Sequence, residues 1–82
     1  MLNILQSKKW DFWIDRGGTF TDIVAKDPSG KIHTSKILSE NDQLYKDAGM
    51  AGIKRFLKVP PGEKIPTDII NSIKINIFDY IS

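Results

Sequence analysis

A pair of glycines, Gly17 and Gly18, separates two short apolar runs near the start of the chain. The run before them, residues 12–14, has the sequence Phe-Trp-Ile and is typical of a strand covered on both faces. Glycine permits a tight reversal of the chain and lets other groups approach the backbone closely. The pattern therefore predicts a hairpin of two strands, over residues 10–15 and 19–26, joined by a glycine loop.

Strand signals continue after this hairpin. The Asp-Pro-Ser-Gly sequence of residues 27–30 is typical of a turn, because proline fixes φ and glycine accepts positive φ. Residues 32–38 then alternate roughly between apolar and polar side chains and are rich in β-branched types. We expect a third strand there, which completes an antiparallel meander of three strands.

The spacing of apolar residues changes to that of a helix in the second half of the chain. Several N-cap candidates occur in residues 39–42, and the apolar positions predict a helix over residues 42–58. Gly49 and Gly52 weaken such a helix by up to ~1 kcal/mol each. Close approach of the helix to the sheet would offset that cost.

Prolines mark the end of the predicted helix. Pro60 and Pro61 stop the helical pattern, since the residue before a proline avoids helical backbone angles. We expect a short helical turn over residues 66–70 and a fourth strand over residues 72–78. The predicted order is β-β-β-α-β, an α+β or α/β arrangement.

Size and composition limit what this chain does by itself. Its 82 residues, 40% of them hydrophobic, suffice for one small soluble domain and are too few for a two-lobed enzyme. The basic residues are spread along the chain, and Lys8 and Lys9 come closest to a cluster, so we expect no nucleic-acid partner. No stretch approaches the ~20 apolar residues that span a bilayer, so we expect no membrane partner.

Single residue types exclude some further chemistry. The chain has no cysteine, which excludes disulfides and thiolate metal sites and suits a reducing cytoplasm. His33 has no companion ligands at useful spacing, so an exposed or hydrogen-bonded strand histidine is favoured over a metal ligand. Trp10 and Trp13 lie on a predicted core strand, which favours packing over stacking on a base.

The glycine loop contains the residue types of a phosphate site. The N–H groups of Gly17, Gly18 and Thr19 can converge on a concavity that suits phosphate oxygens. The hydroxyls of Thr19 and Thr21 are candidate additional donors. The pattern alone leaves a second interpretation open, because two glycines between strands also serve simply as a turn.

Two acids flank the loop. Asp15 ends the first predicted strand, and Asp22 lies within the second. A carboxylate beside phosphate is unfavourable unless a cation lies between them, and Mg²⁺ takes few protein ligands and keeps several waters. Asp15 is therefore the candidate metal ligand, and Asp22 is either a second acid in the same cleft or a support of the loop. An acid at a strand end is also often a plain surface residue.

The sequence around the loop resembles that of a known family. Residues 12–24, Phe-Trp-Ile-Asp-Arg-Gly-Gly-Thr-Phe-Thr-Asp-Ile-Val, closely resemble the start of the hydantoinase/5-oxoprolinase N-terminal domain. The likeness continues downstream in residues 36–41, 45–48, 51–57 and 65–66. It covers residues 10–75, and Arg16 leans toward the 5-oxoprolinase branch of the family.

The resemblance implies a fold and a domain organisation. The expected fold is the start of an actin-like (ribonuclease H-like) ATPase, in which the glycine loop is the first phosphate-binding hairpin. Residues 10–78 would be an incomplete ATPase subdomain, preceded by a leader over residues 1–9 and followed by a tail over residues 79–82.

The resemblance also implies an activity. The family chemistry would be ATP-driven opening of 5-oxo-L-proline to L-glutamate in the cytoplasm, as part of glutathione metabolism, with phosphorylation of the amide oxygen as the route. ATP and Mg²⁺ would be the cofactors, and the substrate would be a 5-oxoproline-like cyclic amide, with a hydantoin left open as an alternative.

The resemblance assigns roles to residues of the loop. Asp15 would help to hold the metal, and residues 17–19 would hold phosphate. Thr21 and Asp22 would support the loop. Arg16 would either stabilise developing phosphoryl charge or pair with a neighbouring acid, and the sequence favours neither.

The likeness stops near the C-terminus. The family continues with a glycine-threonine-threonine segment and a long remainder, whereas residues 75–82 here have a different sequence. We therefore expect a truncated N-terminal piece that is inactive alone, binds nucleotide weakly or undetectably, and depends on a missing remainder. The alternatives are a non-catalytic remnant or small interaction module that pairs through an exposed sheet edge, and a piece of a related actin-fold kinase.

Overall fold

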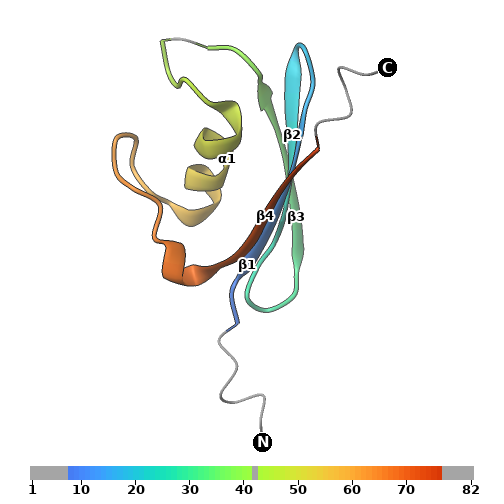
Figure 1. Ribbon diagram of the computed structural model, residues 1–82, viewed down its shortest axis with the longest axis vertical. Coiled ribbons are helices and arrows are strands. Elements are labelled where there is room, and N and C mark those ends of the chain that lie inside the picture. The colour runs from blue at the N-terminus through green and yellow to red at the C-terminus, as the bar shows by residue number, and fades with distance from the viewer. Residues whose placement is uncertain (1–7, 42, 77–82) are drawn as a thin grey trace, which may run out of the picture.

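The chain forms a four-stranded sheet with one helix packed on one face (Figure 1), as shown by a computed structural model that describes residues 8–41 and 43–76. The elements in chain order are β1 (Trp10–Arg16), β2 (Phe20–Lys26), β3 (Ile32–Leu38), α1 (Ala48–Leu57), the 3-10 helix η2 (Thr67–Ile69) and β4 (Ile70–Asn76). The predicted β-β-β-α-β order is confirmed, and so is the short helical turn before the last strand.

The strands lie in the order β3-β2-β1-β4. The first three form the predicted antiparallel meander, and β4 pairs with β1 in parallel. A parallel neighbour needs a crossover connection, and the segment that contains α1 supplies it. The result is a small mixed α/β unit in which β1 is central and β3 and β4 are the edges.

The core lies between α1 and one face of the sheet. Alternate residues of each strand point toward the helix, as the period of a strand requires. The buried apolar side chains are Phe12, Ile14, Ile23, Ala25, Ile37, Ala48 and Ile53. The predicted close approach of the helix is confirmed, because a Cβ on Gly49 would meet Ile14 and a Cβ on Gly52 would meet Ile23.

The other face of the sheet is not covered by any described element, which corrects the expectation that β1 is covered on both faces. Trp13 is 37% exposed there, although it was expected to pack in the core. Trp10 does pack, and its ring stacks on that of Phe12 with the centroids 5.6 Å apart. The difference arises because odd and even positions of β1 face opposite sides and the single helix covers one of them.

The helix begins at Ala48, six residues after the predicted start. Asp47 caps it by accepting a hydrogen bond from the Met50 N–H at 3.1 Å. The preceding segment instead folds back on itself, since Tyr45 forms a bridge with Asn41 and donates its hydroxyl to the Leu38 carbonyl at 2.6 Å. Apolar spacing extended the prediction too far, because Tyr45 packs from a turn and not from a helix.

The fourth strand begins at Ile70, two residues before the predicted start at 72, and the predicted residues 77 and 78 lie outside the described residues. The pairing of β4 with β1 shifts by one residue between Trp10 and Asp11, since Trp10 pairs with Ile70 and Asp11 pairs with Ser72. Asn71 is the extra residue on β4. The side chains of Asn71 and Ser72 both donate to the Asp11 carboxylate, at 2.8 and 2.6 Å. These hydrogen bonds, with that of Ser72 the stronger cause, lower the pKa of Asp11.

Two remaining observations concern membrane-spanning segments and the two ends of the chain. Within the described residues, no helix is both long and apolar enough to cross a membrane. Of the predicted leader, only Lys8 and Lys9 are described, and the predicted tail over residues 79–82 lies outside the described residues.

Candidate functional site

The glycine loop lies at the exposed tip of the β1–β2 hairpin, which runs from blue to cyan at the top of Figure 1. Pairing between the two strands ends at Arg16 and Thr21. The Gly17 N–H then donates to the Phe20 carbonyl at 2.9 Å and closes the hairpin. This N–H is therefore used inside the loop, and Gly18 and Thr19 form its outermost part.

The two glycines have different surroundings. Neither has a φ in the left-handed region, so the turn does not depend on the conformational freedom that glycine pairs often supply. A Cβ on Gly17 would lie 2.9 Å from the Phe20 carbonyl oxygen, whereas a Cβ on Gly18 would meet nothing within 4 Å. Gly17 is thus needed for the hairpin itself, while the space beside Gly18 is open to a ligand.

Two buried hydroxyls hold the loop from the helix side of the sheet. Ser39 follows β3 directly, and its N–H donates to the Thr19 carbonyl at 2.8 Å. Its hydroxyl donates to the Gly17 carbonyl at 2.6 Å and lies 2.9 Å from the Thr21 hydroxyl. Thr21 and Ser39 are 0% and 3% exposed. The loop is therefore fastened on both sides of Gly18.

Sequence reasoning missed the role of Ser39. It counted Ser39 among the N-cap candidates of the helix, but the cap is Asp47. The available signal was the strand register, because pairing of Phe20 with Leu38 brings the next residue along the chain beside the loop. Thr21 was expected both as a ligand donor and as a support of the loop, and its buried hydroxyl contacts Ser39.

The two acids lie side by side on the open face of the sheet. Asp15 and Asp22 are direct partners in the β1–β2 register, and both are exposed. Like charges at such positions repel each other. The Lys36 ammonium lies 3.8 Å from Asp22 and offsets part of that repulsion. A cation beside Asp15 would offset more of it.

The acids fit a weakly held Mg²⁺ better than a closed metal site. Carboxylate oxygens are suitable ligands for this ion, which keeps several waters and takes few groups from the protein. Within residues 8–41 and 43–76, no group of three or more His, Cys, Asp or Glu side chains gathers around one point. Asp15 would therefore share such an ion with water and with phosphate oxygens.

Arg16 lies on the opposite face from the acids, because neighbouring side chains of a strand alternate. It pairs with Thr21 in the register and is exposed at the end of β1. Asp15 and Arg16 thus flank the loop from two sides of the sheet.

The single histidine belongs to a different structure, the turn between β2 and β3. His33 Nε2 lies 2.8 Å from the Asp27 carboxylate, which confirms the predicted hydrogen-bonded strand histidine. Asp27 also accepts hydrogen bonds from Ser29 and from the Lys31 N–H. Hydrogen bonding to His33 first, and then to Ser29, holds the pKa of Asp27 far below its usual range.

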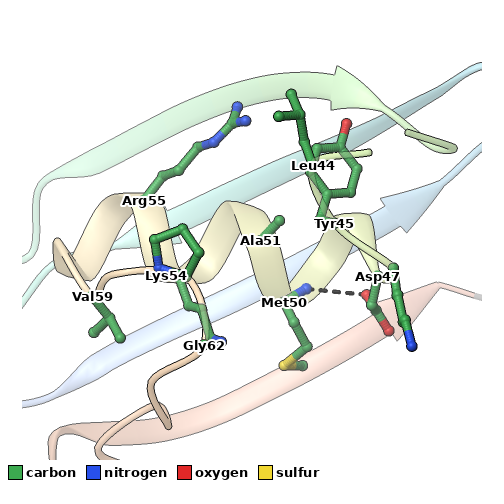
Figure 2. A pocket seen from close by; sticks show the side chains of 11 residues that line it. Leu44, Tyr45, Asp47, Met50, Ala51, Lys54, Arg55, Val59 and Gly62 are labelled. Carbon is green, nitrogen blue, oxygen red and sulfur yellow. Dashed lines mark hydrogen bonds between the residues drawn. The ribbon is translucent and has the colours of Figure 1, made fainter. Parts of the chain in front are cut away.

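Two hollows lie away from the loop. Figure 2 shows one of them beside α1, lined by Leu44, Tyr45, Lys46, Asp47, Met50, Ala51, Lys54, Arg55, Val59, Pro61 and Gly62. Its lining combines apolar and charged side chains, and the Arg55 guanidinium lies 5.8 Å from the centre of the Tyr45 ring. The other surrounds the β2–β3 turn at the opposite end of the sheet. Neither hollow includes a residue of the glycine loop, which is an exposed tip.

Comparison with known proteins covers most of the chain. Residues 11–76 match the family described as the hydantoinase/oxoprolinase N-terminal region. The chain is 45% identical over 74 residues to 5-oxoprolinase 1 of Arabidopsis thaliana, which covers 82% of this chain and 6% of the relative. No solved structure matches.

Two further relatives also match most of this chain and only a small part of their own length. The 5-oxoprolinase of Dictyostelium discoideum is 39% identical over 69 residues, which is 83% of this chain and 6% of the relative. The 5-oxoprolinase of Saccharomyces cerevisiae is 42% identical over 59 residues, which is 68% of this chain and 5% of the relative. The chain thus spans about one twentieth of the length of the curated relatives it matches.

Proposed function

This chain belongs to the hydantoinase/oxoprolinase N-terminal region family, and we propose that its glycine loop binds the phosphates of ATP, with Asp15 beside them as a ligand of Mg²⁺. The observation that carries the proposal is the contrast between the two glycines. Gly17 is required by the hairpin, but nothing in the described structure requires Gly18 to lack a side chain. Close approach of a ligand supplies that reason.

The polar groups around Gly18 suit a phosphate. Backbone N–H groups at an exposed loop favour anions, and the loop is fastened from beneath by buried hydroxyls. Asp15 lies one residue before the end of β1, and its carboxylate is the group that would hold Mg²⁺ beside the loop. Mg²⁺ supplies neutralising charge there when bound. Arg16 projects from the opposite face of β1, and its positive charge at the base of the loop would favour an anion there.

For a full-length protein of this family, we propose ATP-dependent opening of 5-oxo-L-proline to L-glutamate. The names of the relatives, which are 5-oxoprolinases, support 5-oxoproline as the substrate. A lactam carbonyl is a poor electrophile until its oxygen becomes a leaving group, and phosphoryl transfer to that oxygen makes it one. The region described here would contribute the phosphate-binding hairpin to this reaction.

The same proposal extends to the fold. Three antiparallel strands, a crossover helix and a fourth strand parallel to the first have the order expected for the start of an actin-like ATPase domain. The exposed edge of β4 is where a further parallel strand of such a sheet would pair.

Calorimetric titration with Mg-ATP tests the proposed binding. We expect a dissociation constant on the order of 1 mM for the chain as it stands, because a single loop supplies few contacts. Gly18→Val should abolish the binding by filling the ligand space. Asp15→Asn should weaken binding when Mg²⁺ is present. When Mg²⁺ is removed by a chelator, the same change should strengthen binding, because it removes the repulsion between the metal-free carboxylate and the phosphates.

The matched control for these variants is Asp68→Asn, which removes an exposed acid from η2, away from the loop. It should bind as the unchanged chain does. Equal affinity of the unchanged chain and Gly18→Val would rule out the loop as the phosphate site.

A second function, that of an interaction module, is favoured by one observation. The open face exposes the large apolar side chains of Trp13, Phe20, Ile32 and Leu38, and the edge strand β4 exposes Ile73 and Ile75. Apolar surface of this kind and an unpaired strand edge are both typical of association sites. Sedimentation over a range of concentrations tests this function, and a monodisperse monomer throughout would contradict edge-mediated pairing between copies.

A further inference from the structure

We propose that Ser39 is a positioning residue of the glycine loop, which sets the direction of the Gly18 N–H by holding the Gly17 carbonyl. The identity of the ligand that this N–H would bind, a phosphate, rests on the proposed function. The direction itself rests on the hydrogen bonds of the loop alone.

The geometry follows from the planarity of the peptide bond. The Ser39 hydroxyl donates to the Gly17 carbonyl oxygen at 2.6 Å. The Gly17–Gly18 peptide bond is trans, and the carbonyl and the N–H of a trans peptide point in opposite directions. The Gly18 N–H therefore points away from the buried Ser39. The surroundings of Gly18 are open, since a Cβ there would meet no atom within 4 Å.

This hydrogen bond replaces a more common one. In a hydrogen-bonded β-turn, the carbonyl of the first residue accepts the N–H of the residue three positions later. Here the first residue is Gly17, and its carbonyl accepts the Ser39 hydroxyl, while its N–H still donates to Phe20. Ser39 thus keeps the tip of the hairpin in a conformation that the turn alone does not specify.

The direction of the hydrogen bonds shows that Thr21 also helps to hold the Gly17 carbonyl. A hydroxyl has one proton to donate, and Ser39 gives its proton to the Gly17 carbonyl. In the contact of 2.9 Å between Thr21 and Ser39, Thr21 is therefore the donor. The result is a directed chain from Thr21 to Ser39 to Gly17, in which each bond polarises the next. Both hydroxyls are buried, so water does not compete for them.

A second contact prevents the loop from pivoting. The Ser39 N–H donates to the Thr19 carbonyl at 2.8 Å, while its hydroxyl holds Gly17. One residue thereby fixes the Gly17–Gly18 peptide and the Thr19–Phe20 peptide, which lie before and after the Gly18–Thr19 peptide. A change that removes only the hydroxyl would leave the Thr19 contact and release the Gly17 peptide.

The test compares Ser39→Ala with the unchanged chain by residual dipolar couplings of the loop amides, which report N–H directions without any ligand. We expect the Gly18 N–H coupling to change in Ser39→Ala and in Thr21→Val, the second of which keeps the side-chain volume. Ser39→Thr, which retains a hydroxyl, should restore it. Ser35→Ala is the matched control, because it removes a hydroxyl from β3, the strand that precedes Ser39, away from the loop.

The same variants are then titrated with Mg-ATP. Loss of one oriented donor should weaken binding roughly fivefold to tenfold in Ser39→Ala, with less effect in Thr21→Val and none in Ser35→Ala. Thermal unfolding of each variant is recorded beside the affinity. Ser39→Thr should recover affinity even where its melting temperature stays lowered, a result that a purely structural role would not produce.

Each outcome decides one of the two claims. An unchanged Gly18 coupling in Ser39→Ala overturns the positioning role, whatever happens to the affinity. A changed coupling with unchanged affinity would support the positioning role of Ser39 and contradict the claim that the Gly18 N–H direction serves phosphate binding. If the unchanged chain binds no Mg-ATP, the proposed function fails, and the couplings still decide whether Ser39 sets the direction of the N–H.

Discussion

Gly17 and Gly18 are adjacent, but the structure gives them different tolerances to substitution. Gly17→Ala should lower the free energy of unfolding by about 1–3 kcal/mol, because its Cβ would lie 2.9 Å from a backbone oxygen that closes the hairpin. Gly18→Ala should change it by less than about 0.5 kcal/mol. Urea denaturation of the two variants measures this difference. Equal losses would show that Gly18, too, is needed for folding and would remove the argument for a ligand.

The lowered pKa of Asp27 predicts that the stability of the fold depends on pH. Its folded-state pKa lies far below the ordinary aspartate value of 3.8, so the carboxylate contributes stability above about pH 4, and this stability is lost as pH falls through the folded-state pKa. Asp27→Asn should therefore be less stable than the unchanged chain at pH 7. The gap should narrow progressively from about pH 5 to about pH 2 in denaturation curves. A gap that stays constant over this range would contradict the assignment.

At the scale of elements, contact between α1 and β2 depends on the absence of a side chain at Gly52. A Cβ there would collide with the Ile23 side chain. Gly52→Ala should cost about 1–3 kcal/mol despite the better helix propensity of alanine. Adding Ile23→Val removes the atom that the new Cβ meets.

The double variant Gly52→Ala with Ile23→Val should therefore be more stable than the sum of the two single changes implies, since Ile23→Val alone costs about 0.5–1.5 kcal/mol. Equilibrium denaturation of the three variants forms the cycle. Strict additivity would show that helix and sheet are not in the close contact described.

The sequence predicted strands better than the helix boundary, for local reasons. The third strand was expected at residues 32–38 and occurs at Ile32–Leu38, because turn residues on one side and a change of period on the other delimit it. The start of α1 was misplaced because Tyr45, which packs against the core from a turn, has the spacing of a helical residue.

Within the candidate site, the loop and its acids were found from the sequence, and Ser39 was not. The glycines and Asp15 are contiguous, so their chemistry is visible in one short segment. Ser39 lies 22 positions from the carbonyl of Gly17 that it holds, and only the β2–β3 register brings the two together. A propensity at one position carries no information about such a distant contact.

At the scale of the molecule, the fold leaves much apolar surface without a cover. α1 lies over β1, β2 and β3 on one face, and the opposite face exposes Trp13 and three other large apolar side chains. The matched region is 6% of the length of the Arabidopsis relative. The second proposed function uses this surface directly, and in the first the rest of a larger protein would cover it.

The central claim is that the tip of the β1–β2 hairpin receives phosphate. The most direct measurement is a map of backbone amide shifts during titration of the labelled chain with Mg-ATP to about 10 mM, a concentration that would nearly saturate a site of roughly millimolar affinity. We predict the largest shifts at Gly18 and Thr19, with neighbouring shifts at Asp15, and their loss in Gly18→Val. Shifts confined to the hollow beside α1, or an unchanged spectrum of the loop, would contradict the account.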